Sequence, residues 1–457
     1  MVILGAGSGG YACALRAAEL GRSVVLVERD KLGGTCLHQG CIPTKALLHA
    51  AEVADSAREG AKVGVRSSVD GIDIAGVHSY MDGVVGRLYK GLQGLIASRK
   101  ITVVQGTGRF EAPNAVVVDD GDAPGRYVGT DVVLATGSYA RTLPGLDIGG
   151  RILTSTEALR LDEVPGKVLV LGGGVIGVEF ASVFASFGSS VTVVEALPRL
   201  VPTEDPFASK LLERAFRRRK IACRTGVTFT GAKQDAEGVT VSLESGEELA
   251  ADYLLVAVGR GPNTAEHGFA EAGIAMDRGF VQVDAQLRTN LPHVYAVGDI
   301  VAGPQLAHRG FAQGVFLAEQ LAGRNPPPID EAGIPRVTYC DPEVASVGLT
   351  EEQARERHGD VATLTYDLAG NGRSQILQTQ GAIKLVKAGA DGSAGPVVGI
   401  HMVGARVGEL IGEAQLIYNW DAHAEDVAAL VHAHPTQNEA LGEAHMALAG
   451  KPLHAHS

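Results

Sequence analysis

Apolar and polar positions near the start of the chain follow one another in a regular order. The apolar run Val2 to Leu4 leads into the turn GAGSGG, and a helix is expected from there to Leu20. Residues 23–27 form a second apolar run that ends at Glu28. The order predicts two parallel strands joined by a glycine-rich turn and a helix.

The same order returns in the middle of the chain. Residues 168–171 are apolar and lead into GGGVIG, a helix to Phe187, an apolar strand over 190–194 and then Glu195. In both copies the acid lies 18 residues after the third glycine. The chain therefore contains an internal repeat of one strand–turn–helix–strand unit.

Each glycine of the G-x-G-x-x-G turn has a physical task. The first allows the tight turn, the second lets the backbone approach a pyrophosphate, and the third lets the helix pack closely on the strand. The phosphates then lie at the helix N-terminus. The repeat predicts two dinucleotide sites, at Gly5, Gly7, Gly10 and Glu28 and at Gly172, Gly174, Gly177 and Glu195.

The acid at the end of each unit bears on which nucleotide binds. A carboxylate there accepts a hydrogen bond from a ribose 2′-hydroxyl and repels a 2′-phosphate. Glu195 therefore favours NAD over NADP at the second site, although Arg199 nearby leaves NADP open.

Later apolar runs suggest how the chain is divided. Residues 132–138 and 254–260 both read as a buried strand that meets a turn, and 294–299 is a third such run that ends in Asp299. From about Pro335 strand-like runs at 383–386 and 397–401 precede helices, and the proline-rich 325–328 is a plausible linker. We predict an α/β fold with two Rossmann-like dinucleotide-binding domains and a C-terminal α+β dimerisation domain. The expected boundaries are 1–147 (FAD-binding, first part), 148–268 (NAD-binding), 269–334 (FAD-binding, second part) and 335–457 (dimerisation).

Composition and charge narrow the class of protein. A length of 457 residues allows two to four domains, and a formal net charge of −12 disfavours nucleic acid or an anionic membrane as the main partner. The basic run 217–220 falls in an expected helix over 209–219, where a solvated face explains it without any function. The N-terminus has no signal-peptide pattern and no apolar run is long enough to span a bilayer, so we expect a soluble, cytoplasmic protein.

The candidate chemistry lies in GGTCLHQGCIPTK, which begins at Gly33, soon after Glu28. Five cysteines do not make a secreted disulfide framework, so the close pair Cys36 and Cys41 is read as chemistry. If Cys36 opened a regular helix, the two residues would be about 140° and about 7.5 Å apart, so a bridge requires a distorted turn. A strained disulfide and a helix N-terminus both favour cycling between disulfide and dithiol.

The cysteine pair has two other interpretations. A zinc half-site would need two more ligands at suitable spacing, and a pair of inert buried thiols would not explain the adjacent glycines. No metal site is expected. Near the C-terminus, His434 is followed five residues later by Glu439, and the two could form an oriented acid–base pair if the turn after Pro435 brings them together.

These motifs resemble those of a known family. The segment Gly33 to Lys45 resembles the redox motif of the pyridine nucleotide-disulfide oxidoreductases, and His434 to Glu439 resembles their C-terminal acid–base motif. The resemblance covers essentially the whole chain. Within the family, the chain is most similar to the members that oxidise dihydrolipoamide for 2-oxo acid dehydrogenase complexes.

The resemblance implies FAD at the first repeat and NAD at the second. It implies that Cys36 exchanges with the substrate, that Cys41 faces the flavin, and that Lys45 lies near the flavin and pairs with Glu179. His434, oriented by Glu439, would be the base and would come from the other subunit of a homodimer. The implied FAD residues are Gly5, Gly7, Gly10, Glu28, Gly34, Thr35, Lys45, Gly108, Thr136, Gly137, Ser138, Asp299, Gln305, Leu306, Ala307 and His308. The implied NAD residues are Gly172, Gly174, Gly177, Glu179, Glu195, Val227 and Gly259.

The expected reaction is oxidation of dihydrolipoamide with transfer of hydride to NAD⁺, and the expected partner is a lipoylated acyltransferase subunit of a 2-oxo acid dehydrogenase complex. A glutathione-type reductase is disfavoured because it has a tyrosine where this chain has Val175 and arginines around Glu195. Mercuric reduction needs a C-terminal cysteine pair, whereas the last cysteine here is Cys340. A quinone or dye reductase activity and an additional scaffolding role stay open.

Overall fold

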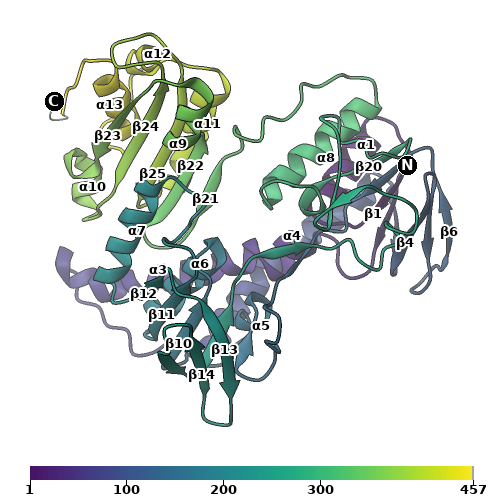
Figure 1. The fold of residues 1–457 in the computed structure, drawn as a ribbon, viewed down its shortest axis with the longest axis horizontal. Helices are drawn as coiled ribbons and strands as arrows, with labels where there is room; N and C mark the ends of the chain where they lie inside the picture. The colour runs from purple at the N-terminus through teal and green to yellow at the C-terminus, as the bar shows by residue number, and fades with distance from the viewer. Residues whose placement is uncertain (455–457) are drawn as a thin grey trace.

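The first repeat builds a five-stranded parallel sheet in the computed structural model, which describes residues 1–454. The strand order is β20-β7-β1-β2-β3. The strands are β1 (Val2–Leu4), β2 (Val25–Glu28), β3 (Thr102–Gln105), β7 (Val132–Leu134) and β20 (Val294–Ala296). Helices α1 (Ser8–Glu19) and α8 (Ala307–Leu321) pack against each other beside it (Figure 1). β1, β7 and β20 are wholly buried because both faces of the sheet are covered there.

The second repeat builds a second five-stranded parallel sheet, in the order β12-β11-β10-β16-β9. Its strands are β9 (Ile152–Leu153), β10 (Lys167–Leu171), β11 (Ser190–Glu195), β12 (Ala222–Thr225) and β16 (Tyr253–Val256). The helices that accompany it are α5 (Ser155–Ala158), α6 (Val175–Phe187) and α7 (Pro206–Arg218). The two sheets confirm the predicted pair of Rossmann-like units.

The repeat also includes a three-stranded antiparallel sheet that the sequence pattern did not reveal. This sheet lies in the chain between β3 and β7 in the first unit and between β12 and β16 in the second. The strands are β4 (Gly108–Ala112), β5 (Ala115–Val118) and β6 (Gly125–Val128) in the first unit, and β13 (Phe229–Gln234), β14 (Val239–Leu243) and β15 (Glu248–Ala251) in the second.

The two units are joined by the runs that follow β7 and β16. β8 (Ser138–Ala140) pairs antiparallel with β17 (Arg260–Pro262), so the similar ends of the two units meet. The chain then forms the hairpin β18 (Met276–Asp277) and β19 (Phe280–Val281) and, after β20, the 3-10 helix η2 (Gly298–Ile300).

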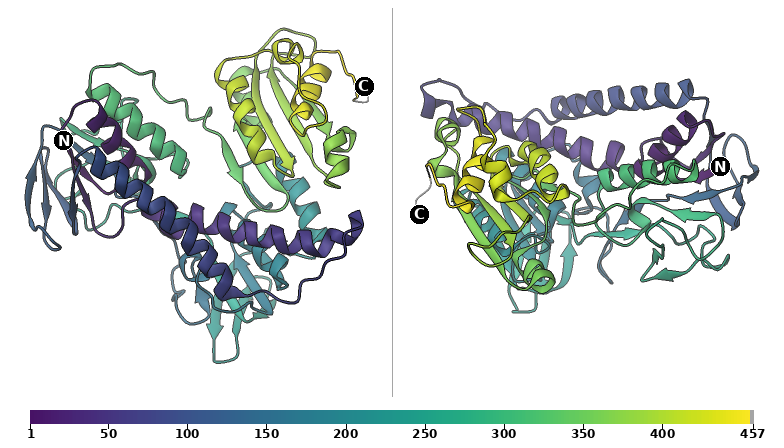
Figure 2. Two further views of the ribbon diagram at one scale, coloured as in Figure 1. Left: turned by 180° about the vertical axis from the view of Figure 1, so that it is seen from behind. Right: turned by 90° about the horizontal axis from the view of Figure 1, so that it is seen from above.

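The cysteine segment leads into two long helices. α2 (Gly34–Gln39) is followed at once by α3 (Cys41–Glu59), η1 (Gly60–Val63) and α4 (Ile74–Ser98). Figure 2 shows α3 and α4 extending from the first sheet toward the second. α3 packs against α6, so the cysteine helix contacts both nucleotide units.

The C-terminal part forms an antiparallel sheet in the order β21-β22-β25-β24-β23 (Figure 1). Its strands are β21 (Arg336–Thr338), β22 (Glu343–Gly348), β23 (Val361–Asp367), β24 (Ala382–Ala388) and β25 (Val397–Gly404). Its helices are α9 (Glu351–His358), η3 (Leu368–Gly370), α10 (Gly372–Ile376), α11 (Val407–Asn419), α12 (Ala424–Ala428) and α13 (Glu439–Leu448). Every residue of β24 and β25 is buried. This part confirms the predicted α+β architecture.

A buried ion pair attaches this sheet to the second nucleotide unit. Lys384 Nζ on β24 lies 3.0 Å from Asp205 Oδ1, just before α7, and 2.8 Å from Glu351 Oε2. Burial alone would raise the pKa of Asp205, but the backbone N–H groups of Glu351 and Phe207 and the Lys384 ammonium lower it below its ordinary value. Asp205 therefore stays charged although it is fully buried.

Some predicted boundaries differ from the structure. The helix expected over 209–219 begins at Pro206, because the Asp205 side chain caps it and proline suits its first turn. The strand expected over 23–27 begins at Val25. Within residues 1–454, none of the helices combines the length and the apolar character needed to cross a membrane.

Candidate active site

The glycines of the two turns occupy equivalent positions. A Cβ atom on Gly10 would lie 1.9 Å from the carbonyl oxygen of Gly5, and one on Gly177 would lie 1.9 Å from that of Gly172. Gly5 and Gly172 also have φ angles of 101° and 110°, which side-chain-bearing residues rarely adopt. The first and third glycines are therefore required by the backbone itself.

The middle glycines face open space. A Cβ on Gly7 or Gly174 would meet no atom within 4 Å. These two residues are the N-caps of α1 and α6, and neither helix start has a side-chain cap. Free N–H groups at an uncapped helix start beside a cavity suit a phosphate. The residues present thus fit the pyrophosphates of two dinucleotides.

The two strand-end acids hold the turns in the same way. Glu28 Oε2 accepts a hydrogen bond from the N–H of Ala6 at 2.7 Å, and Glu195 Oε2 accepts one from the N–H of Gly173 at 2.6 Å. Each carboxylate therefore lies beside the turn where a ribose would follow the pyrophosphate.

Arg199 does not face this nucleotide position. Its Nη2 donates to the carbonyl oxygens of Pro202 at 2.9 Å and Glu204 at 3.2 Å. The guanidinium is used to hold its own loop, so it does not offset the repulsion between Glu195 and a 2′-phosphate.

The two cysteines lie on either side of a break between helices. Cys36 is the third residue of α2, Cys41 is the first residue of α3, and Gly40 between them leaves helical geometry with φ −140° and ψ −114°. Cys41, and not Cys36, therefore opens the long helix, which corrects the geometry assumed from the sequence. Both thiols are free in this structure.

The two thiols have different acidities. A hydrogen bond with the Cys36 thiol lowers the pKa of Cys41 to about 7, and the charge of Lys45 also lowers it, while burial acts in the opposite direction. The same hydrogen bond and burial raise the pKa of Cys36. The start of α3 adds its dipole at Cys41. Near neutral pH the thiolate is therefore on Cys41.

Lys45 lies one helical turn after Cys41 and is held from both sides. Its Nζ lies 2.9 and 2.8 Å from the two carboxylate oxygens of Glu179 on α6, and 4.8 Å from the ring centre of Tyr339. Burial alone would lower the pKa of Lys45, but Glu179 outweighs burial and the pKa lies above its ordinary value. Lys45 therefore stays charged next to the thiolate.

A cavity of about 1640 Å³ joins the cysteines to both glycine turns. The sequence-predicted residues that line it are Gly7, Thr35, Cys36, Cys41, Lys45, Gly137, Ser138, Gly172, Gly174, Glu179, Glu195, Val227, Gly259, Asp299, Gln305, Leu306, Ala307 and His308. A second cavity of about 320 Å³ is lined by Gly5, Glu28, Gly34, Gly108 and Thr136, among others. Pockets for small-molecule ligands are typically about 300–1,000 Å³, so the two cavities together leave room for two dinucleotides.

His434 and Glu439 contact each other but do not line this cavity. His434 Nδ1 lies 3.0 Å from Glu439 Oε1, and Glu439 Oε2 accepts a hydrogen bond from the N–H of Thr436 at 2.9 Å. The His434 side chain is 72% exposed. Within one chain, this pair is therefore separate from the two cysteines.

Arg260 is a cavity residue that the sequence reasoning missed. Its Nε donates to Ser138 Oγ at 2.8 Å, and Ser138 Oγ in turn donates to Asp299 Oδ2 at 2.5 Å. Arg260 lines both cavities, and burial lowers its pKa. The available signal was its place directly after Gly259 in a run that repeats the one ending at Ser138.

Comparison with known proteins identifies related chains. The sequence profile described as "Pyridine nucleotide-disulphide oxidoreductase" matches residues 1–314, and the profile of that family's dimerisation domain matches 334–445. Dihydrolipoyl dehydrogenase of Geobacillus stearothermophilus is 39% identical over 99% of this chain and 97% of its own length. The mitochondrial dihydrolipoyl dehydrogenase of Pisum sativum is 38% identical over 99% of this chain and 92% of its own length.

Two solved structures of similar fold match nearly the whole chain. The crystal structure of LpdA from Mycobacterium tuberculosis has a TM-score of 0.89 and 25% identity, with 98% of this chain and 99% of that chain covered. The HOCl-induced flavoprotein disulfide reductase RclA from Escherichia coli, in its Cu(II) complex, has a TM-score of 0.87 and 28% identity, with 98% of each chain covered.

Proposed function

We propose that this chain, which belongs to the pyridine nucleotide-disulphide oxidoreductase family, is a dihydrolipoyl dehydrogenase. It oxidises dihydrolipoamide through Cys36 and Cys41 and passes the electrons through FAD to NAD⁺. The observation that carries this proposal is the Cys41 thiolate beside Lys45 in one cavity with two dinucleotide turns. The substrate follows from the names of relatives that match along the full length.

The thiol chemistry balances with the chain's own residues. In the oxidised enzyme a substrate thiolate attacks Cys36 Sγ, a new S–S bond forms, and the Cys36–Cys41 bond breaks with the electron pair left on Cys41. The second substrate thiolate displaces Cys36, which closes the lipoamide disulfide. The charge of Lys45 lowers the pKa of Cys41 and so makes it a better leaving group, because a thiol of lower pKa leaves faster.

The bound flavin would take up the two electrons of the dithiol and pass them to NAD⁺ as hydride. The chain's part is to hold the thiolate on Cys41 beside Lys45 and to bind both nucleotides. The FAD site is proposed at the first turn with Glu28, Thr136 to Ser138, Asp299 and 305–308. The NAD site is proposed at the second turn with Glu195, Val227 and Gly259. Support comes from the two cavities that these residues line.

His434 is proposed as the base that takes the substrate's proton, and Glu439 as the group that orients it. The chain carries the family's dimerisation domain, and we propose a homodimer in which the partner subunit supplies this pair. Two observations support a second subunit: the His434 side chain is 72% exposed, and the pair does not line its own chain's cavity.

Further parts of the assignment are also proposals. We propose a division at 1–147, 148–268, 269–334 and 335–457. It is supported by β20, which follows the second unit in the chain but pairs with β7 in the sheet of the first unit. Residues 455–457 lie outside the described part. NAD rather than NADP is supported by Glu195 and by the engaged Arg199. A lipoylated acyltransferase partner follows from the proposed substrate. A cytoplasmic location is supported by the free thiols of Cys13, Cys223 and Cys340 outside the redox pair, which suit a reducing compartment.

The test is anaerobic titration of the purified yellow protein with dihydrolipoamide, followed by addition of NAD⁺. We expect the long-wavelength absorbance of a thiolate next to flavin, and then NADH absorbance at about 340 nm. Flavin that NADH or NADPH reduces but dihydrolipoamide leaves unchanged would refute the proposal. That result would favour a quinone or dye reductase.

A further inference from the structure

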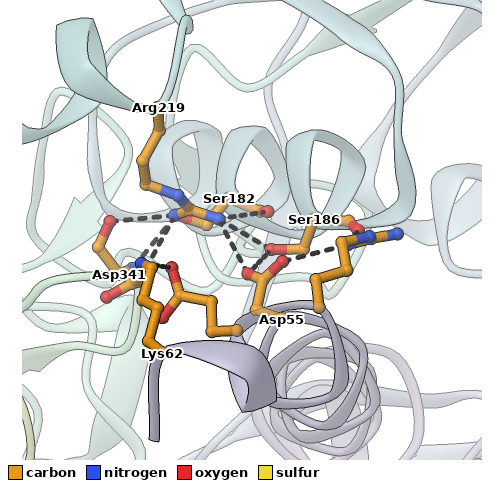
Figure 3. Close-up of polar contacts among 8 residues, drawn as sticks. Asp55, Lys62, Ser182, Ser186, Arg219 and Asp341 are labelled. Atoms are coloured by element: carbon orange, nitrogen blue, oxygen red, sulfur yellow. Dashed lines mark hydrogen bonds and ion pairs between the residues drawn. The ribbon is translucent and has the colours of Figure 1, made fainter. Parts of the chain in front are cut away.

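Arg219 differs from the rest of the basic run 217–220. Arg217, Arg218 and Lys220 are exposed, as expected for a solvated face. The Arg219 side chain is only 18% exposed and points into the junction between three parts of the fold (Figure 3). The solvated-face interpretation therefore holds for three of the four residues and not for Arg219.

The Arg219 guanidinium binds residues from three separate segments. Nη2 donates to Ser186 Oγ on α6 at 2.7 Å and to Asp55 Oδ2 on α3 at 3.3 Å. Nη1 donates to Ser182 Oγ on α6 at 3.1 Å and to the carbonyl oxygen of Asp341, after β21, at 2.9 Å. Figure 3 shows these contacts converging on the one guanidinium.

The residues around Arg219 also bind one another. Ser186 Oγ donates to Asp55 Oδ2 at 2.5 Å, and Arg58 donates to the carbonyl oxygen of Ser186. The N–H of Asp341 donates to Ser182 Oγ at 3.1 Å. We call this set (Asp55, Arg58, Ser182, Ser186, Arg219 and Asp341) the Arg219 junction.

The Arg219 junction is the second polar contact between α3 and α6. The first is Lys45 with Glu179, near Cys41. Asp55 lies ten residues after Lys45 on α3, or about 15 Å along the axis, and Ser186 lies seven residues after Glu179 on α6, or about 10 Å. α3 and α6 also share an apolar core, and two polar contacts this far apart add to that packing in fixing their crossing angle.

We propose that Arg219 is a positioning residue for the redox centre. By fixing α3 against α6 at the far end, it keeps the Lys45 ammonium seated on Glu179 and beside the Cys41 sulfur. Through the carbonyl oxygen of Asp341 it also ties the segment Tyr339–Asp341 to α6. The N–H of Tyr339 in that segment donates to Glu179 Oε1 at 2.9 Å. The proposal rests on the proposed function, because its role is to set the geometry of that thiolate.

The experiment compares Arg219→Ala with Arg218→Ala, which removes the same charge from the exposed face next to it. Arg219→Lys tests whether charge alone suffices, and Ser186→Ala weakens the junction without removing a charge. Each holoenzyme is checked for flavin content and melting temperature. Two quantities are then measured: the stopped-flow rate of flavin reduction by dihydrolipoamide, and the pH midpoint of the long-wavelength thiolate absorbance in the two-electron-reduced enzyme.

With Arg219→Ala we expect the reduction rate to fall about tenfold and the midpoint to shift upward by about half a pH unit, because a small displacement of Lys45 weakens its effect on Cys41. Arg219→Lys and Ser186→Ala should show smaller changes in the same direction, and Arg218→Ala should match the wild type. If Arg219→Ala loses its flavin, Arg219→Lys and Ser186→Ala decide the question by the same two readouts.

Values for Arg219→Ala that equal those for Arg218→Ala would overturn the proposal, and so would a lowered melting temperature with an unmoved midpoint. A failure of the proposed function would give a different result, because dihydrolipoamide would then not reduce the flavin of the wild-type enzyme either.

Discussion

Removal of the charge on Lys45 should raise the pKa of Cys41. At its pKa of about 7 the Cys41 thiol is half ionised at neutral pH, whereas at the ordinary value of 9.0 it would be about 1% ionised. Lys45→Met removes one of the two main lowering effects and leaves the Cys36 hydrogen bond in place. The midpoint should therefore rise by about one to two pH units, and not beyond.

The partner of Lys45 adds to this effect. Glu179 is buried, and in Lys45→Met its carboxylate would have no cation beside it while still raising the pKa of Cys41. The double variant Lys45→Met/Glu179→Gln removes that charge as well. Its midpoint should lie between those of the single variant and the wild type.

The assay is the rate of alkylation of the reduced enzyme by iodoacetamide as a function of pH, read together with the long-wavelength absorbance. Lys45→Arg, which keeps the positive charge, is the control and should stay near the wild-type midpoint. If Lys45→Met titrates at the same pH as the wild type, the charge of Lys45 does not set the acidity of Cys41 and the reasoning fails.

Three other changes test separate parts of the assignment. His434→Gln should slow flavin reduction by dihydrolipoamide about hundredfold or more while reduction by NADH is unchanged; equal slowing of both would contradict a base role. Glu195→Ala should raise the KM for NAD⁺ about tenfold with a much smaller effect on the dithiol half-reaction, and an unchanged KM would remove Glu195 from the ribose site. Lys384→Met should lower the free energy of unfolding in urea by about 3–5 kcal/mol, because it leaves the buried Asp205 carboxylate unpaired. Because the pKa of Asp205 is lowered, the stability from this ion pair should be present at neutral pH and lost as the pH falls through the lowered pKa. The difference in free energy of unfolding between variant and wild type should therefore become smaller in acid.

The glycine turns and the two parallel sheets could be predicted from the sequence. The third glycine is fixed by a contact within the turn, because a Cβ on Gly10 or Gly177 would meet a carbonyl oxygen of the same turn, and the first glycine is fixed by its positive φ angle. Such local constraints appear directly as a spacing of residue types. Strands such as β1 and β7 were visible for a related reason, since burial on both faces leaves short runs that are wholly apolar.

The geometry of the cysteine pair was only partly predictable. The sequence indicated a distorted helix between Cys36 and Cys41, but the structure has two helices, with the break at Gly40 and the longer helix starting at Cys41. Nothing in the spacing of the cysteines states which of them begins a helix. That depends on how α3 packs between the two nucleotide units.

The remaining features depend on residues that are far apart in the chain. Arg219 is one of four adjacent basic residues, and only its place beside α3 and α6 separates it from its exposed neighbours. His434 and Glu439 are recognisable as a pair, yet their own chain does not bring them to the cysteines. The sequence determines what each segment can form, because turns, caps and strands depend on neighbouring residues. Tertiary structure decides which charges meet, because a contact between distant segments depends on the packing of the helices and sheets that carry them.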